Sequence, residues 1–240
     1  NPGMGVIGTA QPRVEDHRFL TGSASFTDDL PVRLEPLATA AHVVYIGSPV
    51  AHGRLRAVAV QAALARAGVA AVITAADVPP ELGDFPLDVA GLGPGMARSW
   101  LADGVVRYVG EPVAAVVADT LEAALDAAEH VVVEVDPLPT IVDPVAALAE
   151  GAPLLFPETG SNVCFRMPRR HPVDFATCEV VVGATLINQR VNAAPLEPRA
   201  GAACWLDARV TLWATTQGVW PVKRALAAAY RLAADDDLLL

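Results

Sequence analysis

The chain has 240 residues, 53% of them hydrophobic, which is enough apolar material for one large domain or two small ones. Only 5% are aromatic, so alanine, valine and leucine must form most of the core. The net charge of -10 argues against a protein that binds nucleic acid, which needs basic patches, and against one that binds an anionic membrane surface.

The sequence lacks the features of membrane, exported and metal-cysteine proteins. No apolar run approaches the roughly 20 residues that a membrane helix needs, and the opening residues do not have the regions of a signal peptide. Cys164, Cys178 and Cys204 are odd in number and form no C-x-x-C pair. This disfavours a disulfide scaffold, a zinc site or an iron–sulfur cluster in this chain, so we expect a reducing, cytoplasmic location.

The N-terminal segment, residues 1–29, is expected to be mostly irregular because glycine and proline interrupt it. Charges alternate in sign over residues 13–18, which is typical of a solvated arm. Asp28 and Asp29 precede Pro31, where aspartate commonly stabilises a turn through its own backbone.

A strand–helix–strand unit is predicted next. β-Branched and aromatic residues over 38–48 indicate a strand that ends at Pro49. A second strand at 55–60, a short helix at 61–67 and a buried strand at 69–74 follow. This order places the helix on one face of a sheet.

Three isolated polar residues have more than one interpretation. His42 and His52 lack a third ligand nearby, so packing or a surface role is favoured over a metal site. Glu111, between glycine and proline, suits a turn or bulge, and a catalytic carboxylate is the alternative.

Residues 79–95 hold four prolines and four glycines, which predicts a long loop, often functional or facing a partner.

A second unit repeats this order of elements. We expect two strands, a helix and a third strand at residues 105–109, 112–118, 121–130 and 131–135. Asp119 and Glu122 have the spacing of a capping box, in which each satisfies free backbone N–H groups at the start of the helix.

The segment at residues 137–172 is rich in proline and is the best candidate for a linker, with one short helix at 145–149. It also carries the basic cluster of Arg166, Arg169, Arg170 and His171. That cluster is either a salt-bridged contact to another domain or subunit, or a solvated patch.

The last region should combine strands with one helix. The expected elements are a strand at 179–189, a strand at 210–214, a helix at 221–230 with proline in its first turn, and a terminal leucine strand that awaits a partner. Trp205, Trp213 and Trp220 are its expected aromatic anchors.

The most unusual chemistry lies in residues 188–217, where Gln189, Arg190, Glu197 and Arg199 surround a small-residue run broken by proline. The strand that follows, 210–214, delivers Thr215, Thr216 and Gln217 at its end, directly before Gly218. A neutral amide fixed by a strand, beside a glycine that lets backbone approach closely, can present a hydrogen bond to a ligand. The alternative is a buried glutamine that ties down a loop.

Several motifs occur in one order along nearly the whole chain. They are RVEDHRFLTGSASFTDDL at 13–30, SPVAH at 48–52, RYVGEPVA at 107–114, QRVNAAPLEPRA at 189–200 and TLWATTQ at 211–217. Together they resemble the molybdenum-cofactor subunit of the xanthine dehydrogenase, aldehyde oxidase and carbon monoxide dehydrogenase family. The chain departs from the family pattern at Ala200, where glycine is frequent, and at Thr215, where serine is usual.

The resemblance implies an α+β fold. An N-terminal arm and an α/β hammerhead domain, with a mixed sheet and packed helices, would occupy residues 1–136. A proline-rich linker at 137–172 would lead to the first part of an α+β molybdopterin-binding domain at 173–240. The arm would then pack against a larger assembly rather than lie in solvent.

The resemblance also implies a molybdopterin-dependent oxidoreductase. Such an enzyme oxidises a small substrate (an aldehyde, an N-heterocycle or purine, or carbon monoxide) with oxygen derived from water. The cofactor would be molybdenum-molybdopterin, expected as the cytosine dinucleotide. Electrons would pass through [2Fe-2S] clusters to FAD on partner subunits or domains, in a dimer of the heteromeric unit.

By this resemblance Gln217 would hydrogen-bond an oxo ligand of molybdenum, and Gly218 would give the cofactor clearance. Glu111, Glu197 and Arg199 are expected to be structural. The family's G-G-G-F-G loop and its catalytic glutamate would lie beyond Leu240, so we assign no catalytic residue and no metal ligand here. The alternative is a non-catalytic module, a split subunit or a fragment, that completes such a complex.

Overall fold

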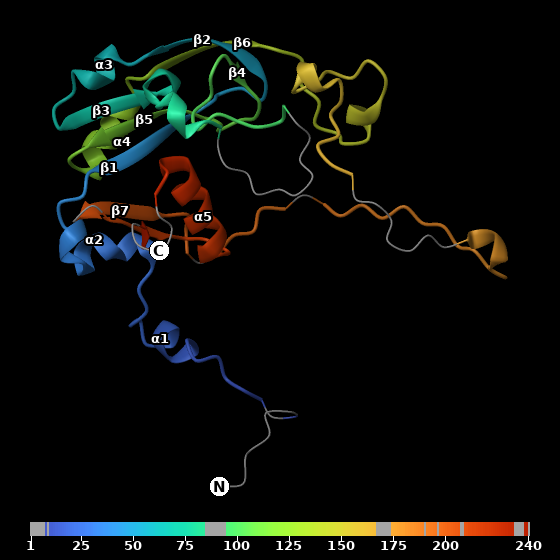
Figure 1. Ribbon diagram of the computed structural model, residues 1–240, viewed down its shortest axis with the longest axis horizontal. Coiled ribbons are helices and arrows are strands. Elements are labelled where there is room, and N and C mark those ends of the chain that lie inside the picture. Colours follow the sequence, from blue (N-terminus) through green and yellow to red (C-terminus); the bar gives the residue numbers. More distant parts are fainter. Residues whose placement is uncertain are drawn as a thin grey trace.

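The computed structural model describes residues 8, 10–84, 95–166, 174–189, 191–195, 197–206, 209–232 and 238–239. Figure 1 shows a body of two small sheets, with a third sheet and a helix beside it and two segments that extend away. The fold class predicted from the sequence, α+β, is confirmed. Within the described ranges every helix is too short or too polar to cross a lipid bilayer.

Short helical turns, rather than a fully irregular chain, make up much of the N-terminal arm. They are α1 (Asp16–Leu20), η1 (Thr27–Asp29), α2 (Leu30–Arg33) and η2 (Glu35–Leu37). The side chain of Asp29 accepts a hydrogen bond from the backbone N–H of Phe26, at 2.9 Å. This confirms that an aspartate of the Asp28–Asp29 pair serves the turn, because its carboxylate holds the backbone just before η1.

Six strands form two three-stranded sheets in the first half of the chain. One has the order β1-β5-β3 and the other β4-β2-β6. The strands are β1 (His42–Gly47), β2 (Gly53–Ala59), β3 (Val69–Thr74), β4 (Val105–Val106), β5 (Pro112–Ala118) and β6 (Val132–Pro137). Every strand pair described in these two sheets is antiparallel. The two sheets differ in this respect from the mixed sheet that was expected.

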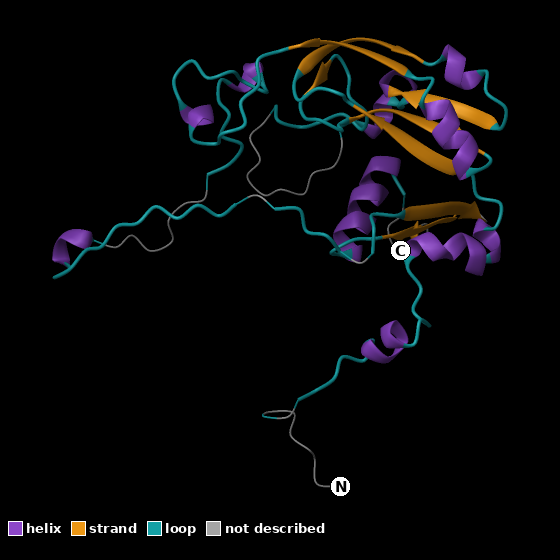
Figure 2. Ribbon diagram, turned by 180° about the vertical axis from the view of Figure 1, so that it is seen from behind, coloured by secondary structure: helices purple, strands orange, loops and turns teal. Residues whose placement is uncertain are grey.

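The core lies between the sheet β1-β5-β3 and helix α4 (Leu121–Ala128), which rests on that sheet in Figure 2. Its buried side chains are nearly all small: Ala63, Val72, Ala114, Val116, Ala118, Ala124, Ala127 and Val131. Alanines on both surfaces let helix and sheet approach closely, so this core needs few aromatic residues. This agrees with the composition, from which a core formed mostly by alanine, valine and leucine was expected.

The start of α4 corrects one prediction from the sequence. The N-cap is Thr120, whose hydroxyl accepts a hydrogen bond from the backbone N–H of Ala123 at 3.1 Å. The capping box between Asp119 and Glu122 was therefore wrong by one residue. Threonine is itself a good N-cap, and it takes the position because the helix begins at Leu121. The shorter helix α3 (Gln61–Leu64) ends three residues before the predicted boundary.

The remaining short turns of the first half are η3 (Ala75–Asp77) and η4 (Pro80–Leu82). The carboxylate of Asp77 accepts from the backbone N–H and the hydroxyl of Thr74, both at 2.8 Å. These donors favour the ionised form and lower the pKa of Asp77. Most of the loop predicted at residues 79–95 lies outside the described residues.

Two of the sequence motifs pair with each other. The backbone N–H of Ser48 donates to the Glu111 carbonyl at 2.8 Å, and that of Gly110 donates to the Ser48 carbonyl at 2.8 Å. The buried Glu111 carboxylate accepts from the N–H of Arg107. His52 is buried too, with its Nδ1 3.1 Å from the carbonyl oxygen of Pro139. Both side chains therefore have structural roles.

Residues 143–162 form a compact, turn-rich structure with η5 (Ala146–Leu148) and η6 (Pro157–Thr159). The Asn162 side chain donates to the carbonyls of Ala147 and Pro153 and accepts from the N–H of Leu155. This structure contacts the first sheets, because the Arg107 guanidinium lies 4.4 Å from the centre of the Phe156 ring. Of the basic cluster, Arg166 is exposed and the other members lie outside the described residues.

The second half holds the sheet β7-β8-β9, of β7 (Gly201–Leu206), β8 (Arg209–Ala214) and β9 (Leu238–Leu239), together with helix α5 (Val219–Tyr230). β7 and β8 are antiparallel, and β9 runs parallel to β8. The terminal leucine strand thus has a partner within this chain. Trp205 and Trp220 are exposed rather than anchored in a core.

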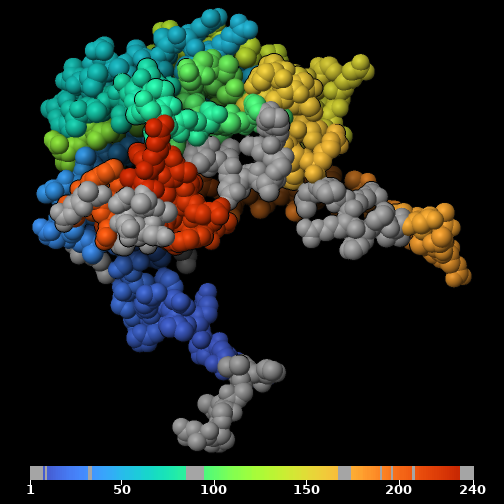
Figure 3. All heavy atoms as spheres, viewed as in Figure 1, coloured from blue at the N-terminus to red at the C-terminus, as the bar shows by residue number. Residues whose placement is uncertain are grey.

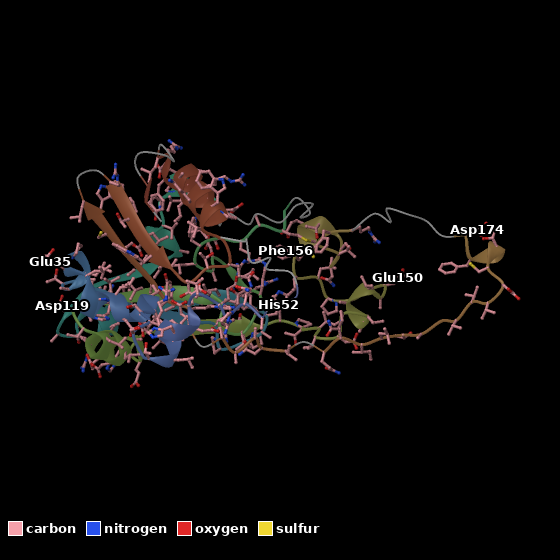
Figure 4. The ribbon with its side chains drawn as sticks, turned by 90° about the horizontal axis from the view of Figure 1, so that it is seen from below. Glu35, His52, Asp119, Glu150, Phe156 and Asp174 are labelled. Atoms are coloured by element: carbon pink, nitrogen blue, oxygen red, sulfur yellow. The ribbon has the colours of Figure 1, made fainter. Side chains whose placement is uncertain are left out.

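The strand predicted at residues 179–189 is wrong. After η7 (Phe175–Thr177) these residues lie exposed, without helix or strand, in a segment that projects from the body in Figure 3. Figure 4 places Asp174 at the far end of that projection. The residues have strand-forming side chains, but no described strand supplies the hydrogen-bonding partner that a strand requires.

The close approach of Gly47, which precedes the first of these motifs, to Gly110 in the second gives a stability prediction. A Cβ at Gly47 would lie 2.7 Å from the Cα of Gly110, so backbone must shift to admit it. Gly47→Ala should lower the free energy of unfolding by about 1–3 kcal/mol, and the apparent Tm by several degrees. Gly183→Ala is the matched control, since nothing lies within 4 Å of its added Cβ. Equal melting temperatures for the two variants in thermal denaturation would contradict the close approach.

Candidate functional site

The strand pair β7–β8 places two of the sequence motifs side by side. Gly201 pairs with Ala214 at one end of the ladder. The pairing continues past that end, because the backbone N–H of Thr215 donates to the Ala200 carbonyl at 3.0 Å. The PLEPRA segment and the Thr-Thr-Gln segment are therefore direct neighbours, as the ends of two adjacent strands must be.

The Thr215 side chain fixes the loop that precedes β7. Its hydroxyl donates to the carbonyl oxygen of Pro198 at 3.1 Å and lies 3.4 Å from the backbone nitrogen of Ala200, from which it accepts. One hydroxyl thus satisfies two backbone groups that a proline-broken segment cannot pair in a regular ladder. The family's usual serine would supply the same hydroxyl.

The next two polar residues form the turn into α5. The Thr216 hydroxyl accepts from the backbone N–H of Gly218 at 3.2 Å, and Gly218 is the N-cap of the helix. Pro221 follows in the first turn, where a missing N–H has no intrahelical partner to lose. A Cβ at Gly218 would lie 3.2 Å from the Cδ of Pro221, so glycine here lets the turn pack against the proline ring.

Gln217 directly follows these two anchored threonines, precedes Gly218 and is exposed. Its amide makes no hydrogen bond to another described residue, whereas Thr215 and Thr216 are engaged with backbone. The interpretation of Gln217 as a buried amide that ties down a loop is therefore wrong. What remains is an uncharged donor and acceptor, positioned by a strand on one side and a helix start on the other.

Glu197 links this region to the N-terminal arm. Its Oε1 accepts from the backbone N–H and from the hydroxyl of Thr27, both at 2.9 Å, across 170 residues of sequence. The hydrogen bonds from the Thr27 backbone and hydroxyl hold the pKa of Glu197 below its usual range, although partial burial acts in the opposite direction. The structural role expected for Glu197 agrees with these bonds.

The other polar residues of this segment are not gathered at the site. Arg199 and Gln189 are exposed, and Arg190 lies outside the described residues. Cys164 and Cys178 are exposed free thiols, and Cys204 is a half-buried one on β7. In the described part of the chain, no three His, Cys, Asp or Glu side chains gather in a way that would hold a metal ion.

The bond between Thr27 and Glu197 was not anticipated from the sequence. Both residues lie in motifs that the sequence analysis had marked, at the two ends of the chain. A carboxylate that follows a proline-broken run, and a threonine beside two aspartates, are common surface patterns. The order of the motifs alone was the available signal that they belong to one structure.

The Thr215 hydroxyl gives a second stability prediction. Thr215→Val keeps the shape and the backbone bond to Ala200 but leaves the Pro198 carbonyl and the Ala200 N–H without this partner. We expect a loss of about 1 kcal/mol and faster hydrogen exchange at the Ala200 amide. Thr215→Ser should behave like the wild type. If the valine variant exchanged no faster than the serine variant, the hydroxyl would not fix this loop.

Acid should weaken the contact between Glu197 and Thr27. Because the pKa of Glu197 is lowered in the fold, the contact stabilises the protein above the ordinary glutamate pKa. That stabilisation is lost as the pH falls through the lowered value. Deuterium uptake over residues 26–30, corrected for intrinsic rates, should therefore rise below about pH 4. A Glu197→Gln variant should lack this acid dependence, and an identical pH profile in both proteins would refute the assignment.

Two family models match the chain in succession. Residues 21–139 match the a/b hammerhead domain of aldehyde oxidase and xanthine dehydrogenase, and residues 155–236 match the molybdopterin cofactor-binding domain. Gln217, Gly218 and Glu197 all lie in the second match.

Individual proteins agree with these matches. The chain is 36% identical over 227 residues to the nicotine 6-hydroxylase large subunit of Paenarthrobacter nicotinovorans, covering 92% of this chain and 27% of that protein. It is 33% identical over 199 residues to the carbon monoxide dehydrogenase large chain of Hydrogenophaga pseudoflava, covering 76% and 24%. The crystal structure of quinoline 2-oxidoreductase from Pseudomonas putida 86 superposes with a TM-score of 0.78 at 32% identity, covering 96% of this chain and 29% of that one.

The chain thus spans about a quarter of the length of the curated relatives named here. Its two matched regions follow one another in the order that the sequence motifs had indicated. The chain therefore belongs to the aldehyde oxidase and xanthine dehydrogenase family of molybdopterin-dependent oxidoreductases, and it contains a hammerhead domain followed by molybdopterin cofactor-binding sequence.

Proposed function

We propose that this chain is the N-terminal part of the molybdenum-cofactor subunit of a molybdenum hydroxylase, and that Gln217 contacts the cofactor. The observation that carries this proposal is the exposed, unengaged Gln217 amide, which directly follows two anchored threonines. It lies inside the region that matches a molybdopterin cofactor-binding domain. We favour this over a non-catalytic assembly module because that region carries a side chain free to contact a ligand.

The residues suit such a cofactor. An amide donates a hydrogen bond without adding charge, and hydrogen bonds from outside the ligand set tune a metal centre. When bound, the molybdenum cofactor supplies a two-electron oxidation, in which the substrate gains oxygen from water and two protons are released. Gln217 would donate its N–H to the ligands around the metal, and Gly218 would let the cofactor lie close to backbone. The substrate would be an aldehyde, an N-heterocycle or purine, or carbon monoxide.

The expected context is a heteromeric enzyme. Two of the relatives are named as a large subunit and a large chain, and another as subunit gamma of the 6-hydroxypseudooxynicotine dehydrogenase complex. By analogy, the remainder of this subunit and partners with [2Fe-2S] and FAD would complete the assembly as a dimer of the heteromeric unit. The pterin would be the cytosine dinucleotide. The three free thiols favour the cytoplasm.

The division of the chain follows from the same proposal. Residues 1–136 would form the arm and hammerhead domain, 137–172 the proline-rich linker and 173–240 the start of the cofactor-binding domain. The bond between Arg107 and the Leu155 carbonyl, at 3.3 Å, would then hold the linker against the hammerhead domain.

Replacing the amide tests the proposal. In the complete enzyme, Gln217→Ala should lower kcat about 10- to 100-fold, because a hydrogen bond to the cofactor is lost, while the fold stays intact since Gln217 supports no other described residue. Gln61→Ala is the matched control, an exposed glutamine at the start of α3. Steady-state kinetics, with molybdenum content measured in both variants, gives the result. Full turnover by the Gln217→Ala enzyme would overturn the assignment.

A further inference from the structure

The carboxylate of Glu197 joins the N-terminal arm to the segment that precedes β7. Both hydrogen bonds from Thr27, backbone and hydroxyl, end on the same Oε1 of Glu197. Bonds to an ionised acceptor are about twice as strong as neutral ones. Glu197 therefore joins two segments that are 170 residues apart in sequence.

From Glu197 the connection to Gln217 is short and made of described bonds. The next residue, Pro198, accepts from the Thr215 hydroxyl at 3.1 Å, and Thr215 also bonds Ala200 through its backbone N–H at 3.0 Å. Gln217 follows two residues later in the chain, beyond the end of β8 at Ala214. A displacement of Glu197 would therefore be transmitted to Gln217 through two bonds of Thr215. These are the bond from its hydroxyl to Pro198 and the bond from its backbone N–H to Ala200.

The arm also packs beside both supports of Gln217. Arm residues Ser25, Phe26 and Thr27 line a cavity of about 250 Å³ together with Trp213 and Ala214 of β8 and Val219 of α5. β8 ends at Ala214, and α5 begins at Val219, directly after Gly218. The cavity is the space between the arm and this turn, and Glu197 lies on its wall.

We propose that Glu197 is a positioning residue that clamps the N-terminal arm against the end of β8 and so sets the orientation of Gln217. The second half of this statement rests on the proposed function of Gln217, whereas the clamp itself does not. The arm is then a working part of the cofactor-binding region rather than a leader in front of the hammerhead domain. The charges of residues 13–18 remain outward, consistent with the exposed Arg13–Asp16 ion pair.

The chain offers a graded set of variants for this clamp. Glu197→Ala removes both bonds, and Glu197→Gln keeps an oxygen that accepts them but removes the charge. Thr27→Val removes the hydroxyl donor and leaves the backbone N–H donor, whereas Thr27→Ser keeps both donors. Glu134→Ala, at an exposed glutamate on β6, is the matched control.

The clamp is tested by hydrogen exchange in the full-length enzyme within its complex. Exchange at the Thr27 amide should rise at least about tenfold in Glu197→Ala, less in Glu197→Gln and Thr27→Val, and not in Thr27→Ser or Glu134→Ala. If Glu197→Ala does not fold, the two Thr27 variants decide the outcome. An exchange rate in Glu197→Ala equal to that of the wild type would overturn the clamp. If Glu197→Ala cannot be measured, an unchanged rate in Thr27→Val would overturn it.

Kinetics of the same enzymes test the positioning of Gln217. The variants that release the arm should lower kcat in the same order, with KM and molybdenum content unchanged. Gln217→Ala should lower kcat but leave exchange at Thr27 at the wild-type rate. The kcat of this variant therefore tests the proposed function of Gln217, whereas exchange at Thr27 in the other variants tests the clamp. A released arm with wild-type kcat would refute the positioning role.

Discussion

The extension of the β7–β8 ladder beyond its last regular pair is the interaction on which the site depends. The bond from the Thr215 N–H to the Ala200 carbonyl carries the antiparallel register into a segment where Pro198 has no N–H to contribute. The Thr215 hydroxyl then supplies what the proline cannot, by pairing with the Pro198 carbonyl. As a result, a loop that would otherwise vary in conformation is held against the residues that lead from β8 to Gln217.

The two halves of the chain are stabilised in different ways. Among the described residues, the buried hydrophobic side chains fall between Leu37 and Val131, apart from Ala227 on α5. The first half has a packed core of alanine and valine, in which sheet and helix lie close together. The second half is held mainly by backbone pairing and by the hydroxyls of Thr215 and Thr216. Beside β7 and α5 it has an apolar cavity of about 380 Å³, lined by Leu212, Leu226 and Tyr230 among others.

Local patterns predicted the first half well because its elements are decided locally. β3 and β5 have the predicted boundaries, since each is a short apolar run ended by turn or cap residues. The strand expected at 179–189 fails because a strand needs a partner, and side-chain preference does not supply one. The bond between Thr27 and Glu197 was out of reach for a related reason. No periodicity or spacing in the sequence connects Thr27 with Glu197. The order of the motifs was the only indication that the two residues belong to one structure.

The same contrast explains why the position of Gln217 could be predicted but its surroundings could not. A glutamine at a strand end before glycine is visible in the sequence, and the structure leaves its amide exposed and unengaged. What holds it there is a chain of polar contacts through Thr215, Pro198, Glu197 and Thr27, each replaceable only by another group with the same donor or acceptor. With so little buried apolar surface nearby, packing contributes little to the geometry of this turn. The orientation of Gln217 therefore depends on hydrogen bonds that extend back to the N-terminal arm.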